Sequence, residues 1–303
     1  MNRICAGIVL YQPNYDRLKA NIEAILPQVE HLYLVDNASE NLDAIRQAYA
    51  SDEKISLLCN PENYGIAKAL NQMCEAAEDD EYDWIVTLDQ DSVCYDDMVQ
   101  AFVPYLNENG VAILAPKVID DYEIGVLHSD ADPVTQDISR CNTSGSLTNL
   151  FIWRKIGGFD ERMFIDCVDF DYCTNAIVNG YRVVRVFAAK IHHRLGRAIP
   201  IRAFIPLGKL LHIDKWCKTI FTYDHSPERT YYYARNIRYY QYKYRGKINR
   251  RQERITYFRW WFLKLVFEKK RFAKLCAILR GRRDSKKLIR EYRQQEKQKE
   301  KGS

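Results

Sequence analysis

The first 120 residues alternate short apolar runs with segments of helical period, and this alternation limits the chain to few folds. Strands and helices that alternate at such spacing form right-handed βαβ units, in which the strands are parallel. We therefore expect an α/β fold with a mostly parallel sheet that is flanked by helices. The expected strands are residues 3–11, 31–36, 54–59 and 83–89.

A polar group follows each of these four strands. The groups are residues 11–14, 36–39, 60–65 and 89–92, and three of them contain residues that favour turns. Ligands of such sheets bind in the crevice outside the carboxyl ends of the strands. We therefore expect the ligand site at this edge of the sheet.

The net charge of +5 is unevenly distributed along the chain. Residues 251–303 contain 18 Lys and Arg against 6 Asp and Glu, so the first 250 residues are net acidic. From residue 201 the sequence is also aromatic and of helical period. We divide the chain into a ligand-binding domain, residues 1–200, and a helical, basic C-terminal extension, residues 201–303.

Cysteine usage and the absence of long apolar segments indicate the kind of protein. Nine cysteines are scattered without a C-x-x-C pair, which favours neither a disulfide framework nor a zinc site and fits a reducing cytoplasm. The first residues lack the long apolar core of a signal peptide, and no window approaches the roughly 20 apolar residues of a membrane-spanning helix. We expect a globular protein of the cytoplasm.

The stretch "VTLDQDS", residues 86–92, ends an apolar strand with two carboxylates, Asp89 and Asp91. In an extended chain the side chains at i and i+2 leave the same face, so these two would point together. Carboxylates this close repel each other unless a cation lies between them. Mg²⁺ is typically held by one or two carboxylates and by substrate phosphates. The pair predicts such a site, and a simple strand cap is the alternative.

Two further groups at the strand ends suit a nucleotide. Asp36 could accept a hydrogen bond from a base or a ribose, or it could cap the helix expected near residue 40. In "NPENYGIAKALN", residues 60–71, Lys68 would lie one turn into a helix, near the N-terminus that attracts phosphate. A solvated surface lysine is the alternative. No Walker or G-x-G-x-x-G pattern is present, which argues against a P-loop NTPase or a dinucleotide enzyme.

A second acidic group, Asp166, Asp169 and Asp171, precedes an expected helix. Carboxylates in a first helical turn gain from the helix dipole, so a capping role is one interpretation. Apolar and aromatic neighbours can instead raise a carboxyl pKa towards that of a general base. His192 and His193 follow the strand "RVVRVFAAKI" and could be structural or could complete the shell of a divalent metal.

Taken in order, these motifs resemble glycosyltransferase family 2, whose members are inverting enzymes with the GT-A fold. The motifs are "VLYQPN", "VDNAS", "NYGIAKALN", "TLDQDS", "SGSL…WRKIGGFDERMFIDCVDFDY" and "IHHRLG", and the likeness covers about residues 3–240. Within the family, bacterial rhamnosyltransferases are most similar, because residues 164–169 match their "FID-x-VD" motif. The resemblance implies a Rossmann-like sheet and a nucleotide-sugar donor.

The resemblance also implies the role of each site residue. Asp91 would bind the metal, Mg²⁺ or Mn²⁺, on the diphosphate, with Asp89 and His193 beside it. Asp169 would be the base that deprotonates the acceptor hydroxyl; Asp166 stays the alternative, because Val168 replaces the usual Glu. The residues assigned to the nucleotide sugar are Tyr11, Asp36, Asn63, Lys68, Asp89 and Gln90.

The C-terminal extension predicts a contact with a membrane surface. Over residues 255–283, apolar side chains can share one face of a helix, with Lys264 and Lys274 among the basic residues that flank it. A basic amphipathic helix with Trp residues suits a membrane interface. The alternative is a helix that packs on the N-terminal domain. Membrane docking would fit an acceptor carried on a polyprenyl lipid, as such transferases often use.

The resemblance therefore implies a metal-dependent inverting transferase that moves a sugar, L-rhamnose from dTDP-rhamnose, to a saccharide hydroxyl in bacterial O-antigen or capsule assembly. It would lie at the inner face of the cell membrane and could form a homo-oligomer. A galactofuranosyl or other hexosyl transferase that uses a UDP-sugar is the near alternative. A catalytically silent nucleotide-sugar-binding protein is another. Nucleic-acid binding is disfavoured, because no RNA-binding signature is present and the first 250 residues are acidic.

Overall fold

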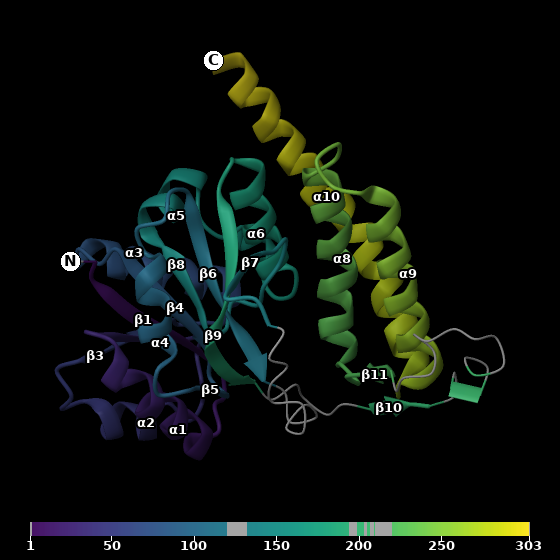
Figure 1. Ribbon diagram of the computed structural model, residues 1–303. Coiled ribbons are helices and arrows are strands. Elements are labelled where there is room, and N and C mark those ends of the chain that lie inside the picture. Colours follow the sequence, from purple (N-terminus) through teal and green to yellow (C-terminus); the bar gives the residue numbers. More distant parts are fainter. Residues whose placement is uncertain are drawn as a thin grey trace. The chain divides into compact units, whose positions relative to one another are not determined.

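The computed structural model describes residues 2–119, 132–193, 199–202, 205–206, 209 and 220–302 (Figure 1). The chain divides into two compact units, Met1–Arg194 and Leu195–Ser303, which we describe separately. The sequence also predicts a hairpin or loop over the polar residues 120–140, but most of them lie outside the described residues, as does the side chain of His193.

Nine strands of the described residues form one sheet in the first unit. Their order is β3-β2-β1-β4-β8-β6-β9-β5, and β7 pairs with β9 outside this path. The strands are β1 (Ile4–Leu10), β2 (Leu32–Asp36), β3 (Ile55–Cys59), β4 (Trp84–Asp89), β5 (Ser92–Cys94), β6 (Val111–Ile119), β7 (Thr135–Asp137), β8 (Ser146–Asn149) and β9 (Arg182–His193).

The sheet has a parallel half and a mixed half. Strands β3, β2, β1 and β4 are all parallel, and they are the four strands that the sequence predicts. β8 then runs antiparallel to β4 and β6, while β6 and β9 are parallel to each other. β5 and β7 both pair with β9 in the antiparallel sense. The predicted α/β fold is confirmed, with antiparallel strands added in its second half.

Helices cover both faces of this sheet (Figure 1). On one side, Leu18 and Ile22 of α1 and Ile45 of α2 join Ile8 and Leu10 of β1 in one buried cluster. Helix α3 contacts β1 and β2 from the other side. The helices are α1 (Tyr15–Ile25), α2 (Leu42–Tyr49), α3 (Ile66–Asp79), α4 (Met98–Phe102), α5 (Leu150–Ile156) and α6 (Val168–Val178), with short 3₁₀ turns η1 (Leu26–Gln28), η2 (Val103–Tyr105) and η3 (Glu161–Met163).

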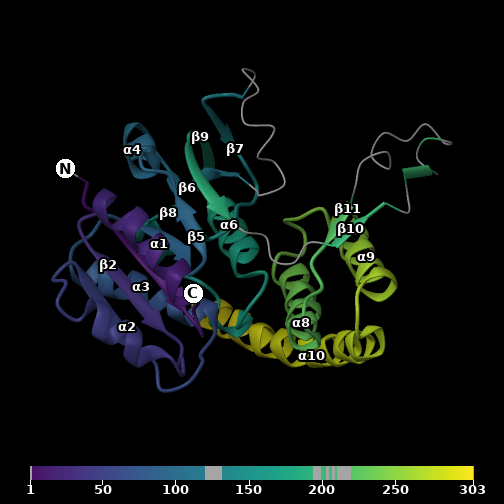
Figure 2. The same ribbon diagram turned by 90° about the horizontal axis from the view of Figure 1, so that it is seen from below.

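The second unit is mainly helical, as predicted (Figure 2). A short antiparallel pair, β10 (Ile199–Ile201) and β11 (Ile220–Thr222), precedes α8 (Pro227–Lys243), α9 (Arg250–Phe267) and α10 (Arg271–Gly302). Helix α8 packs along α10, and their aromatic side chains meet edge to face, as in the pair Tyr239 and Tyr292. In the part of the chain that the structure describes, no helix has the length and apolar character needed to span a membrane.

The prediction of a single amphipathic helix over residues 255–283 is wrong. Glu268 is extended, with ψ of 165°, and Lys270 has a positive φ of 52°, so the chain breaks there into α9 and α10. The apolar residues before and after the break therefore do not share one helical face. Lys264 and Lys274, which the sequence places at the flanks of that face, are 2% and 1% exposed.

These two lysines surround a buried carboxylate. Lys264 Nζ lies 2.7 Å from Glu268 Oε1, and Lys274 Nζ lies 2.6 Å from Glu268 Oε2. The Thr222 hydroxyl also donates to Glu268, and Lys274 makes a second ion pair with Asp224 at 2.8 Å. The cluster ties β11, α9 and α10 together at the break. Because buried charges are costly without partners, Glu268 neutralises a site that two lysines would otherwise destabilise.

Replacing Glu268 with alanine should strongly destabilise the second unit. Glu268→Ala leaves two ammonium groups buried with less compensation, and removing one partner of a buried ion pair typically costs about 3–5 kcal/mol. Glu291→Ala removes a carboxylate from an exposed pair with Lys287 on the same unit, which should cost less than about 1 kcal/mol. Urea unfolding followed by circular dichroism compares the two; equal losses would contradict a structural role for the cluster.

Candidate active site

The carboxyl ends of the four parallel strands meet at one edge of the sheet. Leu10 of β1 pairs with Asp36 of β2, Val9 pairs with Asp89 of β4, and Asp36 pairs with the last residue of β3. β1 lies between β2 and β4, so the strand order changes direction there. Such a switch point leaves a crevice at the strand ends where ligands bind.

Asp36 is fully buried at this edge and only partly satisfied. Its Oδ2 accepts a hydrogen bond from the Ser39 N–H at 2.9 Å, while Oδ1 has no partner among the described residues. The alternative role as a helix cap is wrong, because the residue that precedes α2 is Asn41. A buried carboxylate oxygen without a donor is costly, so this atom is suited to accept from a ligand.

The Gln90 side chain, just after β4, makes two hydrogen bonds to the backbone of Tyr11, just after β1. Its Oε1 accepts from the Tyr11 N–H at 2.8 Å, and its Nε2 donates to the Tyr11 carbonyl at 3.1 Å. The Tyr11 side chain stays 50% exposed. The amide of Gln90 is therefore committed to the protein backbone, and it acts on a ligand through the position of Tyr11.

The two acids of "VTLDQDS" do not lie on one continuous strand. β4 ends at Asp89, and Gln90 and Asp91 form a turn before β5, so the alternation expected from an extended chain does not apply. The backbone of Asp89 is fixed from two sides: its N–H donates to Ser144 Oγ at 3.0 Å and its carbonyl accepts from Asn21 Nδ2 at 2.7 Å. The sequence had not singled out Asn21, although a polar residue on the apolar face of α1 is a signal for such a bond.

Asp89 and Asp91 in this turn are residues of the type that bind a hard divalent cation. No group of three His, Cys, Asp or Glu side chains is placed to bind a metal within the described residues. Asp89 and Asp91 supply carboxylate oxygens, and Mg²⁺ commonly takes its remaining ligands from substrate phosphates and water. Ser92 pairs with His193 in the β5–β9 ladder, so residue 193 lies beside the turn. Its neighbour His192 pairs with Val93.

The segment before α3 contacts residues 159–171, which we call the acidic segment. Asn63 Oδ1 accepts from the Gly65 N–H at 2.9 Å, which forms an Asx turn. Gly65 has φ of 86°, and a Cβ there would lie 2.4 Å from the carbonyl oxygen of Phe164. The Ile66 N–H donates to that same oxygen at 2.7 Å. Only glycine allows this approach of backbone to backbone.

Lys68 points to the acidic segment as well. Its Nζ lies 3.2 Å from Glu161 Oε1, and the two side chains are 36% and 44% exposed. Exposed ion pairs of this kind contribute little to stability, so a phosphate can displace Glu161 at small cost. The assignment of Lys68 to the nucleotide sugar stays a prediction.

Asn71 of α3 is a residue that sequence reasoning missed. It is buried, and its side-chain amide makes two hydrogen bonds to the backbone of Phe159. Oδ1 accepts from the Phe159 N–H and Nδ2 donates to the Phe159 carbonyl, both at 2.9 Å. Nδ2 also donates to Glu161 Oε1 at 2.9 Å. One amide on the buried face of α3 thus fixes the start of the acidic segment.

The acidic segment enters α6 through two left-handed residues. Asp166 and Cys167 have φ of 64° and 65°, which is uncommon outside glycine and clusters at functional sites. Cys167 is the N-cap of α6 and makes no side-chain cap bond. Asp169 lies in the first turn, where its Oδ1 accepts from the Phe170 N–H at 2.9 Å.

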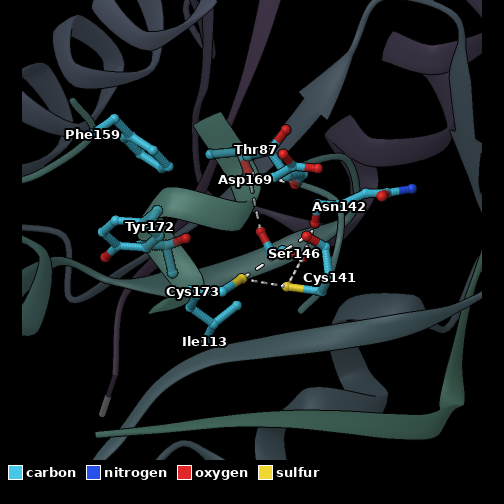
Figure 3. A pocket seen from close by; sticks show the side chains of 11 residues that line it. Thr87, Ile113, Cys141, Asn142, Ser146, Phe159, Asp169, Tyr172 and Cys173 are labelled. Carbon is cyan, nitrogen blue, oxygen red and sulfur yellow. Dashed lines mark hydrogen bonds between the residues drawn. The ribbon is translucent and has the colours of Figure 1, made fainter. Parts of the chain in front are cut away.

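Asp169 lines a small cavity between α6 and β8 (Figure 3). Its volume of about 10 Å³ is close to that of a single water probe. Burial raises the pKa of Asp169 to about 7, and the negative charges of Asp166 and Asp89 add to this effect. The cavity is lined by Thr87, Ile113, Cys141, Asn142, Thr143, Ser146, Thr148, Phe159, Asp169, Tyr172 and Cys173.

The electrostatic coupling shows which predicted acids the fold brings together. Asp89 at the end of β4 and Asp166 before α6 both influence Asp169, although they are far apart in sequence. A carboxylate with a pKa near neutrality can take a proton at neutral pH, as a general base must. A second pocket of about 130 Å³ adjoins this cavity at Cys141 and Asn142, and Arg140 lies over the Phe170 ring at its edge, at 4.7 Å.

Comparison with known proteins identifies the family. The chain belongs to glycosyl transferase family 2, which matches residues 5–162, more than half of the chain. It is 27% identical over 251 residues to the dTDP-rhamnosyl transferase RfbF of Shigella flexneri, and the match covers 78% of both chains. The predicted likeness to bacterial rhamnosyltransferases is thereby confirmed.

Solved structures confirm the GT-A fold. TarS 1–349 of S. aureus in complex with UDP-GlcNAc has a TM-score of 0.59 at 12% identity, with 95% of this chain and 81% of that chain covered. GalNAc-T7 with UDP, GalNAc and Mn²⁺ has a TM-score of 0.57 at 11% identity and covers 88% of this chain, which spans 56% of that one. Identities this low are evidence for the fold alone.

Gly65→Ala should disrupt the junction between α3 and the acidic segment. Gly180→Ala is a matched control, because Gly180 has nearly the same φ, 84°, but no atom within 4 Å of an added Cβ. The control carries only the cost of an L-residue with positive φ, about 1 kcal/mol, while Gly65→Ala adds a backbone clash and should cost at least twice as much. Thermal unfolding measures both; equal losses would show that the close approach is unimportant.

Proposed function

We propose that this protein is an inverting, metal-dependent glycosyltransferase that moves L-rhamnose from dTDP-rhamnose to a saccharide hydroxyl during assembly of a bacterial surface polysaccharide, O-antigen or capsule. The observation that carries the chemistry is Asp169, a carboxyl with a pKa of about 7 in a cavity near Asp89. The similarity to RfbF, a dTDP-rhamnosyl transferase, supports the choice of donor. A UDP-sugar is the alternative donor, since TarS and GalNAc-T7 were both solved with UDP or a UDP-sugar.

Each residue at the strand ends has a role in this proposal. The unpaired Oδ1 of Asp36 accepts a hydrogen bond from the nucleobase, and Tyr11, held by Gln90, lines the same crevice. The Lys68 ammonium gives up its ion pair with Glu161 and binds the diphosphate instead. Asp89, Asp91 and His193 would hold Mg²⁺ or Mn²⁺, which neutralises the charge that develops on the leaving diphosphate.

Asp169 then activates the acceptor. A sugar hydroxyl is a weak nucleophile, so Asp169 takes its proton as the oxygen attacks the anomeric carbon and the bond to the nucleoside diphosphate breaks. A single displacement inverts the configuration at that carbon, and it requires one base but no carboxylate nucleophile. Asp166 raises the pKa of Asp169 by its negative charge and acts as a positioning residue.

We further propose that the protein is cytoplasmic and peripheral at the inner face of the membrane, where its acceptor is carried on a polyprenyl lipid. Exposed apolar side chains on α9 and α10 support the membrane contact, among them Phe258, 63% exposed, and Phe272, 79% exposed. We also propose that the protein forms a homo-oligomer.

The first test is release of nucleoside diphosphate from a panel of dTDP- and UDP-sugars with Mg²⁺ or Mn²⁺ and with EDTA. We expect release from dTDP-rhamnose that EDTA abolishes, and a loss of at least about a hundredfold in Asp91→Ala and Asp169→Asn. Asp96→Ala, which removes an exposed carboxylate five residues beyond Asp91, should keep full activity. Metal-dependent release from another sugar nucleotide would contradict the rhamnosyl assignment, and release unaffected by EDTA would contradict the metal.

The pH dependence of turnover tests the base. Asp169 must be unprotonated to accept the hydroxyl proton, so kcat should fall about tenfold per pH unit below about pH 6 and level off above about pH 8. Asp166→Asn removes a negative charge that raises the pKa of Asp169, so its profile should shift to lower pH while activity persists. If Asp166→Asn abolished turnover and Asp169→Asn kept it, Asp166 would be the base.

A further inference from the structure

A further pocket, larger than the two at the candidate active site, lies within the helical unit, among α8, α9 and α10. Its volume is about 610 Å³, which lies in the range of small-molecule sites. All of its lining comes from the second unit, and none of it belongs to the site described above. The lining residues are Arg238, Gln241, Arg250, Arg254, Tyr257, Phe258, Trp261 and Arg282.

The polar groups of this pocket are almost all hydrogen-bond donors. A guanidinium has five N–H donors and no acceptor, and an indole nitrogen only donates. Trp261 Nε1 and Gln241 Nε2 are buried in the pocket wall and have no partner among the described residues. A ligand that satisfies these groups must therefore be rich in acceptor atoms.

The positive charge of the pocket is also uncompensated. Some arginines of the same unit have partners: Arg245 pairs with Glu296 at 2.8 Å, and Arg293 donates to the Tyr242 hydroxyl at 2.7 Å. The four pocket arginines have no carboxylate within ion-pair distance in the described part of the chain. Guanidinium groups clustered in this way match the geometry of phosphate oxygens, which accept several N–H bonds at once.

An exposed apolar stripe begins at the rim of the pocket. Phe258 lines the pocket and is 63% exposed, and Ile255, Phe262 and Val266 extend along α9 at helical spacing, all of them exposed. A soluble anion would use the donors and leave this stripe in water. A ligand with a phosphate and an apolar chain would satisfy both.

We propose that this pocket binds the phosphate headgroup of an anionic membrane lipid, with the lipid's apolar chain along the stripe of residues 255, 258, 262 and 266. The inference rests on the membrane contact proposed above, names its ligand and its site, and is independent of the transfer reaction. It predicts that affinity for a membrane depends on which arginines are removed and not only on how many.

The test is co-sedimentation of the full chain with phosphatidylcholine vesicles that contain or lack phosphatidylglycerol. The pocket variant Arg254→Gln/Arg282→Gln is compared with Lys286→Gln/Arg290→Gln, which removes two exposed cations of α10 that do not line the pocket. We expect the pocket variant to lose at least about tenfold in partition to the anionic vesicles and the control less than about threefold. Phe258→Ser should weaken vesicle binding as well.

Each other outcome overturns the proposal in a distinct way. Equal losses in the two double variants would show that general surface charge binds the membrane, and the pocket would have no part in it. No binding of the wild type to anionic vesicles would remove the membrane contact itself. Stabilisation of the wild type by inorganic pyrophosphate without vesicle binding, lost in the pocket variant, would identify a site for a soluble phosphate. Vesicle-free binding of a single-stranded oligonucleotide, lost in that variant, would identify a nucleic-acid site.

The transfer reaction of the two double variants is measured in a separate assay. Release of nucleoside diphosphate in solution should be unchanged in both double variants, because none of the four residues belongs to the proposed active site. Failure of the vesicle experiment would therefore leave the proposed reaction intact, and failure of the donor panel would leave the lipid site intact.

Discussion

Helix α3 holds the acidic segment against the parallel half of the sheet, and the geometry of the candidate active site depends on this attachment. The contacts are made by backbone and by one amide: Ile66 donates to the carbonyl of Phe164, and Asn71 brackets Phe159. Because Gly65 has no Cβ, the two backbones come into direct contact. This junction fixes the segment that leads into α6, the helix that carries Asp169.

The two units place charge in their interiors for different purposes. In the first unit, Asp169 is desolvated near other carboxylates, so its protonation state is poised near neutral pH. In the second unit, Glu268 is enclosed by two lysines, and its charge is fully matched. The carboxyl that we propose as the base has no cation among the groups that shift its pKa, whereas the carboxylate that holds the helices together has two lysines.

Much of the parallel half of the fold could be predicted, because it follows from local pattern. Apolar runs of strand length separated by amphipathic helical segments allow few arrangements, and the ends of parallel strands must lie at one edge. The positions of Asp36 and Asp89 at the ends of β2 and β4 were predicted in this way. The C-terminal prediction failed in part for the opposite reason. Helical period continues in the sequence from residue 255 to 283, but the backbone leaves the helix at Glu268, whose carboxylate is buried between Lys264 and Lys274.

The sequence by itself determined the class of fold, and it predicted which edge of the sheet would hold a ligand and which acids would be the candidates for its chemistry. Only the tertiary structure decided which of those acids has a shifted pKa, since the desolvation of Asp169 depends on neighbours such as Thr87 and Ile113 that are distant from it in the chain. It also decided the roles of Asn21 and Asn71, and it brought the donors of the helical pocket together. Burial and the direction of a hydrogen bond are properties of packed elements, and local patterns in a sequence do not contain them.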